Sequence, residues 1–170
     1  MEESWRLTAR SVTKYNPVFR DEKGHYKRND WIGFGQIGGS FDDGVLTFES
    51  YFDIEQKYIQ AAIWFFEFHG CDEIVIRSVE KYDASDYTYE DREEVLALHN
   101  NIDEGLVVTI NNVGNIVKLI LRELLWAELF CTVSEKLALR FGYDFYMYFN
   151  SNGNMDELFG RVTGLGLYIY

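Results

Sequence analysis

Hydrophobic side chains recur at steps of three and four residues along residues 47–70, the longest amphipathic stretch of the chain. This spacing places them on one side of a helix, where they can be buried. Thr47 can accept hydrogen bonds from the amides of the first turn, Glu49 suits the positive end of the helix dipole, and Gly70 can take the left-handed conformation that ends a helix. We therefore predict a central helix. Its expected buried stripe is Phe48, Tyr51, Phe52, Tyr58, Ile59, Ala62, Ile63, Phe65 and Phe66.

The same stretch is long enough to raise the question of a membrane span, which needs about 20 largely apolar residues. Charged residues interrupt it throughout, so we expect no membrane association. These residues are Glu49, Asp53, Glu55, Lys57 and Glu67.

A second amphipathic helix is predicted over residues 113–125, with Lys118 and Arg122 on the side away from the core. Shorter helices are expected over residues 90–100 and 154–162. Alternating or apolar runs predict strands at residues 5–15, 73–79, 106–110 and 165–170, and an antiparallel meander at 126–133, 136–141 and 145–149. The expected class is α+β, a mostly antiparallel sheet packed by one long central helix and a second amphipathic helix. A chain of 170 residues is about one domain, so we assign residues 1–170 to a single domain.

The formal net charge of −12 changes the range of plausible partners. Nucleic acid and anionic membranes would be repelled, whereas a basic partner would be attracted. Acidity for solubility alone is an equally open interpretation. The chain begins MEESWRLTAR, with acidic residues where a signal peptide needs basic ones and no apolar segment after them, so we expect the chain to stay in the cytoplasm.

Candidate chemistry is sparse. Cys71 and Cys131 form no CxxC pair, so we predict buried thiols and neither a disulfide framework nor a zinc site. The run Gly33-Phe34-Gly35-Gln36-Ile37-Gly38 has the G-x-G-x-x-G spacing of a dinucleotide loop, but no buried strand precedes it and no helix opens within it, so a surface loop is expected. Cys71 lies beside His69, but a nucleophilic cysteine is usually served by a histidine brought from elsewhere in the fold. We therefore predict no catalytic residue, cofactor or metal, and a protein that is not an enzyme.

Residues 82–94 differ from every buried pattern, because carboxylates are interleaved with tyrosines. Such a surface could fill a cationic groove, with the tyrosines supplying rigid contact area. A solvated loop that only confers solubility is an equally open interpretation. The candidate partner-binding residues are Tyr82, Asp83, Asp86, Tyr87, Tyr89, Glu90, Asp91, Glu93 and Glu94, with Asp42 and Asp43 from the glycine-rich segment 31–44.

The segments that carry a family resemblance are LTARSVTKYNP, RDEKGHY, NDW, EQKYIQAA and FGYDFYMY. Through these segments, most of the chain resembles immunity proteins of bacterial polymorphic and contact-dependent growth inhibition toxin systems. The resemblance implies a protein that binds a cognate toxin domain and performs no chemistry. The expected partner is a basic toxin domain, with a nuclease favoured, whose active site or substrate-binding face is covered. The alternative is an enzyme or small-ligand-binding protein with a site near residues 31–44.

Overall fold

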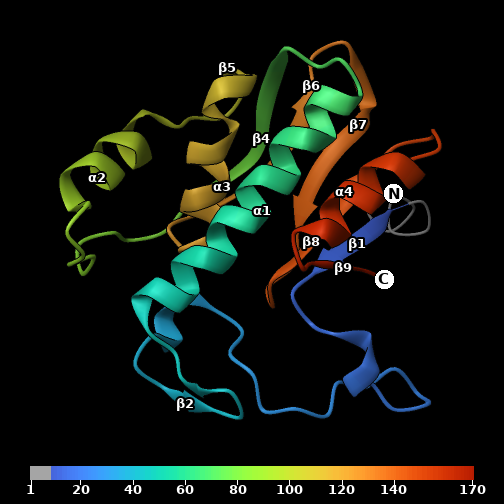
Figure 1. The fold of residues 1–170 in the computed structure, drawn as a ribbon. Coiled ribbons are helices and arrows are strands. Elements are labelled where there is room, and N and C mark those ends of the chain that lie inside the picture. The colour runs from blue at the N-terminus through green and yellow to red at the C-terminus, as the bar shows by residue number, and fades with distance from the viewer. Residues whose placement is uncertain (1–8) are drawn as a thin grey trace.

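The computed structural model describes residues 9–170, which form an antiparallel sheet with helices packed against it (Figure 1). Within these residues the main sheet has seven strands in the order β5-β4-β6-β7-β8-β1-β9, and every neighbouring pair is antiparallel. The α+β class and the β6-β7-β8 meander are therefore confirmed. The strands are β1 Arg10–Thr13, β4 Glu73–Lys81, β5 Val107–Thr109, β6 Leu125–Cys131, β7 Ser134–Phe141, β8 Tyr146–Asn150 and β9 Tyr168–Ile169. The amino-terminal part of the predicted strand 5–15 lies outside the described residues.

The helices are α1 Phe48–Phe68, α2 Arg92–Asn101, α3 Val113–Leu121 and α4 Asp156–Gly164. Figure 1 shows α1 lying across the sheet between α3 and α4. In the part of the chain that the structure describes, no helix is both long and apolar enough to cross a membrane.

Both ends of α1 are formed as its sequence predicts. The Thr47 hydroxyl accepts a hydrogen bond from the Ser50 amide at 3.1 Å, and Gly70 has a φ of +65° after the last turn. Phe65 packs on Phe149 of β8 with ring centroids 4.6 Å apart. The predicted stripe is correct at its centre but not at Phe52, whose side chain is exposed.

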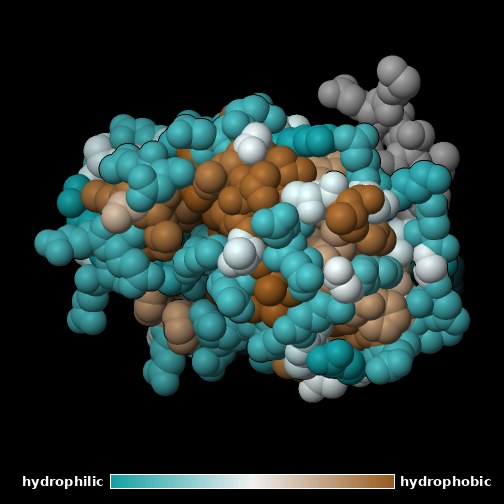
Figure 2. All heavy atoms as spheres, turned by 90° about the horizontal axis from the view of Figure 1, so that it is seen from above, coloured by the Kyte–Doolittle hydropathy of each residue, from teal (hydrophilic) through white to brown (hydrophobic). Residues whose placement is uncertain are grey.

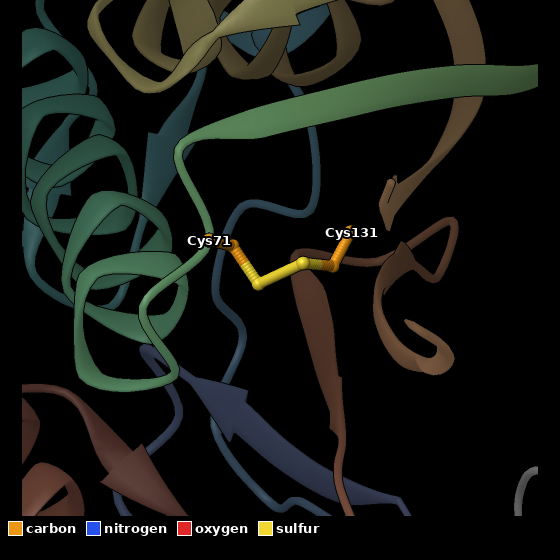
Figure 3. The surroundings of a disulfide bond; sticks show 2 residues. All are labelled: Cys71 and Cys131. Atoms are coloured by element: carbon orange, nitrogen blue, oxygen red, sulfur yellow. A yellow bond between two sulfur atoms is a disulfide. The ribbon is translucent and has the colours of Figure 1, made fainter. Parts of the chain in front are cut away.

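A disulfide joins Cys71 to Cys131, so the prediction of two buried thiols is wrong (Figure 3). The reason is strand register. In the antiparallel pairing of β4 with β6, Ile74 lies opposite Cys131, and this brings the end of β6 beside the loop between α1 and β4. The two Cα atoms are 5.8 Å apart, within the range that a disulfide spans.

The second amphipathic helix is shorter than predicted. It ends at Leu121, and Glu123 has a φ of +61° where the chain turns into β6. Arg122 follows the last helical residue and does not face solvent, because its guanidinium bonds Glu55 of α1 and Asp91. It is only 2% exposed and points into the interior, which corrects the sequence-based assignment.

The glycine-rich segment 31–44 contains more regular structure than expected. A 3-10 turn covers η3 Phe34–Gln36, and β2 Ser40–Phe41 pairs with β3 Gly44–Val45 around an Asp42-Asp43 turn. Further 3-10 turns are η2 Pro17–Phe19 and η4 Ile110–Asn112. Gly44 has a φ of +108°, a conformation that side-chain-bearing residues rarely adopt, and this explains why the tight ribbon needs glycine there.

Figure 2 looks onto the end of the molecule where α1 finishes and β5 lies, and shows hydrophobic side chains gathered in the middle of this face with hydrophilic ones around them. Val107 of β5 and Val133 of the β6–β7 turn are exposed hydrophobic residues from elements at this end.

Candidate functional site

A buried ion pair links α1 to the end of α3. Arg122 Nε and Nη2 donate to the two carboxylate oxygens of Glu55, at 2.7 and 2.8 Å. Both side chains are almost completely buried. Two parallel bonds from a guanidinium to a carboxylate fix the relative position of the groups more tightly than one bond would.

Asp91 and Tyr87 extend this pair towards the surface. Arg122 Nη1 donates to Asp91 Oδ2 at 2.6 Å, the Tyr87 hydroxyl donates to Asp91 Oδ1 at 2.7 Å, and Arg122 Nη1 also contacts the Tyr87 hydroxyl. Burial alone would raise the pKa of Asp91, but the hydrogen bonds from Tyr87 and Arg122 outweigh it and lower that pKa. Burial likewise lowers the pKa of Arg122, but its bonds to Glu55 and Asp91 reverse the shift and raise it. We call Glu55, Arg122, Asp91 and Tyr87 the buried network.

Asp91 and Arg122 of the buried network line a cleft of about 450 Å³. Phe48 and Phe52 come from consecutive turns of α1, and Tyr89 comes from the segment that leads into α2. The Phe48 ring is 5.0 Å from the Tyr89 ring and 6.3 Å from the Phe52 ring, measured between centroids. We call this hollow the aromatic cleft. It is lined by Phe48, Phe52, Tyr89, Glu90, Asp91 and Arg122.

The aromatic cleft is anionic. The Arg122 guanidinium faces the carboxylates of Glu55 and Asp91, and exposed Glu90 adds a third carboxylate at the rim. With all four groups ionised, one positive and three negative charges leave a net charge of −2. Glu49 and Asp53, the next residues after Phe48 and Phe52 on α1, are exposed as well.

The predicted partner-binding residues of segment 82–94 do not all lie at one site in the structure. Glu90 and Tyr89 line the aromatic cleft, and Asp86 and Glu93 are exposed with no ion pair among the described residues. Most of this segment is exposed, as expected, but Tyr87 is only 5% exposed and points inward. Asp91 belongs to the buried network.

The other predicted residues of this segment have separate positions. Glu94 pairs with Lys118 at 3.2 Å. The Asp83 carboxylate accepts hydrogen bonds from the amide and the hydroxyl of Ser85, which form a local turn. Tyr82 is 41% exposed and lines a different hollow.

Asp42 and Asp43 do not reach the aromatic cleft. They form the turn of the β2–β3 ribbon beyond the start of α1 (Figure 1). Arg28 pairs with Asp43 and lies 3.8 Å from Asp42, and the Asn29 amide donates to the Asp42 carboxylate at 3.0 Å. Their negative charges are therefore largely compensated by groups of the amino-terminal region.

Sequence reasoning missed Glu55, Arg122, Phe48 and Phe52 as site residues. A usable signal existed for Glu55, because it follows Tyr51 by one turn and precedes Tyr58 in the buried stripe of α1. A carboxylate in such a stripe requires a buried cation. The pattern does not say which cation, because the partner lies 67 residues away in the sequence.

The glycine-rich run has little capacity to cradle a phosphate. The amides of Gln36, Ile37 and Gly38 donate to carbonyls within the protein at 3.2, 3.2 and 2.7 Å. A Cβ atom at Gly33 would collide with the Glu123 carboxylate, which also lies near Gly35 and would repel an anion. These contacts argue against a nucleotide site in this loop.

A second hollow, of about 290 Å³, lies beside this segment and is mainly apolar. Its exposed walls include Ile32, Tyr82 and Tyr143, and Tyr143 stacks on Trp126 with ring centroids 4.9 Å apart.

Among residues 9–170, no group of three or more His, Cys, Asp or Glu side chains is arranged to hold a metal ion. The chain matches no protein-family model, no curated protein and no solved structure.

Proposed function

We propose that this chain is an immunity-type protein that binds a basic toxin domain, with a nuclease as the favoured class, and neutralises it by covering its active site or substrate-binding face. The observation that supports the proposal is the group of carboxylates in and around the aromatic cleft. Nuclease grooves are cationic because they hold phosphates, and a cationic groove attracts an anionic surface. Glu90 lines the cleft, and the other exposed carboxylates of the two segments that form it are Glu49, Asp53, Asp86 and Glu93; none of these five has an ion pair among residues 9–170.

The shape of the site also favours a protein partner. Phe52 is 40% exposed and Tyr89 is half-buried, so both present aromatic surface beside charge. Aromatic residues in the centre of an acidic rim are typical of binding hot spots. The buried network holds the segment before α2 in place, which reduces the entropy lost on binding.

We propose the cytoplasm as the place where the chain acts, since a toxin that reaches the cytoplasm must be neutralised there. Disulfides are rare in that reducing compartment. The structure contains the oxidised form, so the proposal predicts that the Cys71–Cys131 disulfide is reduced while the chain is in the cytoplasm and forms again on oxidation.

The decisive experiment starts from the gene neighbourhood, where we expect an upstream gene for a large secreted protein with a toxic carboxyl-terminal domain. Cells that express this domain should survive when the chain is co-expressed and die without it. Failure of the chain to protect cells or to bind the purified domain would refute the proposal.

Association with the toxin should slow as salt rises, while dissociation changes less, because exposed charges act mainly on encounter. A triple variant, Asp86→Asn, Glu90→Gln and Glu93→Gln, should lower the association rate about tenfold or more at low salt. The matched control removes the same charge elsewhere through Glu22→Gln, Glu67→Gln and Glu157→Gln, all exposed positions without ion pairs among the described residues. If both triple variants lost the same fraction of the association rate, the rate would depend only on the net charge of the chain and not on the carboxylates near the cleft.

Small-ligand binding is a second candidate, favoured by the apolar hollow beside the glycine-rich segment. The internal hydrogen bonds of the loop amides predict no binding of ATP or NAD in calorimetry. Micromolar binding that Gly35→Val abolishes would move the function to this class.

A further inference from the structure

The aromatic cleft combines features that suit one kind of side chain. Its lining includes three aromatic side chains, Glu90 adds an exposed carboxylate, and its net charge is negative. Aromatic faces attract cations, and carboxylates pair with them. A cationic occupant is therefore favoured over an anionic or a purely apolar one.

The protein's own Arg122 indicates which cation fits these rings. Its guanidinium carbon lies 5.6 Å from the centroid of the Phe48 ring and 5.7 Å from that of Phe34, while its nitrogens bond carboxylates. The more exposed lining residues of the cleft, Phe52, Tyr89 and Glu90, offer the same two kinds of group, aromatic rings and a carboxylate, to the solvent. A planar guanidinium can stack on a ring and bond a carboxylate at the same time, which the compact lysine ammonium does less well.

We propose that the aromatic cleft is a docking pocket for one arginine side chain of the partner, stacked against Phe52 and Tyr89 and paired with Glu90. This inference rests on the proposed function, because it assigns the cleft to a residue of the basic partner. Phe52 and Tyr89 supply the stacking surface, and Glu90 supplies the only rim carboxylate of the cleft that has no ion-pair partner among the described residues.

The test uses a small probe and no toxin. N-acetyl-arginine methylamide is titrated into the isotope-labelled protein at constant ionic strength, and backbone amide shifts are followed by NMR. We expect saturable shifts around Phe52 and Tyr89 with a dissociation constant on the order of 1 to 10 mM, as suits a small single-site ligand. The citrulline counterpart, which has nearly the same shape without the charge, should bind at least tenfold more weakly, and the lysine counterpart severalfold more weakly.

Two variants assign the contacts. Glu90→Gln and Phe52→Ala should each weaken arginine binding at least fivefold. Both positions are exposed, so both variants should fold, which circular dichroism verifies. Glu93→Gln is the matched control, since it removes an equal charge three residues from Glu90 without touching the cleft lining, and it should bind like the parent.

Three results would overturn the inference. The first is that the citrulline compound binds as tightly as the arginine compound. The second is that both cleft variants bind the arginine compound as tightly as the parent does. The third is that Glu93→Gln loses as much affinity for the arginine compound as Glu90→Gln. Because the titration contains no toxin, its failure leaves the toxin-protection result untouched. Conversely, if the arginine compound binds but the chain does not protect cells, the proposed function is refuted while the assignment of an arginine-binding pocket is retained.

Discussion

The two ends of α1 are held in the fold by different kinds of interaction. At the carboxyl-terminal end Phe65 and Phe66 are fully buried, Phe65 packs on Phe149, and the Cys71–Cys131 disulfide joins the following loop to β6. At the amino-terminal half Glu55 bonds Arg122, and Arg122 bonds Asp91. The first end is secured by apolar packing and a covalent bond, whereas the second combines aromatic packing around Tyr51 and Tyr58 with a buried ion pair.

This difference separates stability from geometry. Apolar burial stabilises in proportion to area and has little directional preference. A buried ion pair contributes little net stability, because desolvation offsets its attraction, but it fixes the positions of the groups that it joins. The aromatic cleft lies at the end where directional bonds hold the walls, as a recognition site requires.

Phe65→Ala should have the largest effect, about 5 kcal/mol of unfolding free energy, the upper end for a fully buried phenylalanine. Loss of the ring removes its contact with Phe149 and is expected to leave a cavity between α1 and β8. Urea denaturation measures the loss. Ile63→Ala, at a half-buried position of the same helix, is the control and should cost clearly less. Equal losses would mean that this end is not packed as described.

Reduction of the disulfide should cost about 4 kcal/mol, because the bond closes a loop across a sequence separation of 60 residues in the unfolded chain. Denaturation with and without dithiothreitol gives the difference. The double variant Cys71→Ala and Cys131→Ala should show no response to the reductant. A parent protein that is equally stable under both conditions would show that the covalent bond adds nothing at this end.

Arg122→Met should cost about 3 kcal/mol, since it leaves Glu55 buried without a cation. The double variant Glu55→Leu and Arg122→Met should recover most of that loss, because both charges are removed together. It should nevertheless lose arginine binding in the aromatic cleft, because Asp91 is released. If the double variant had both the stability and the arginine affinity of the parent, the ion pair would not be what fixes the geometry of the cleft.

The sequence predicts the apolar end of α1 better than the charged end. Helix periodicity and the signals at Thr47 and Gly70 are local, and they place α1 within one or two residues. The meander was predictable for the same reason, since turns join neighbouring strands. The disulfide was not, because it depends on the register of β4 against β6, which no local pattern encodes.

The candidate site was predicted only in part. Glu90 and Tyr89 stand out by composition, and both line the cleft. Arg122 was misplaced because its side of α3 faces α1 and the segment before α2, where Glu55 and Asp91 bond its guanidinium. Charge run and helix period do not reveal which distant segments cover a helix, so the buried network appears only in three dimensions.

The smallest predicted effect concerns Asp91 and acid. The pKa of Asp91 is lowered in the folded protein: burial opposes the shift, but the bonds from Tyr87 and Arg122 outweigh it. A lowered pKa means that Asp91 contributes its full stabilisation above the ordinary aspartate value, about 3.9, and loses it as pH falls through the lower folded value. We expect Asp91→Asn to lower the free energy of unfolding by about 1 kcal/mol at pH 7. The difference in unfolding free energy between variant and parent should shrink as the pH falls below about 4.

Asp86→Asn is the matched control for this pH dependence, because Asp86 is exposed and has no ion pair among the described residues. Urea denaturation at a series of pH values should give the control the same acid response as the parent. Arginine binding should separate the two variants further, since Asp91 positions the wall of the aromatic cleft and Asp86 does not line it. If Asp91→Asn kept both the acid response and the arginine affinity of the parent, the buried network would not be what shapes the cleft.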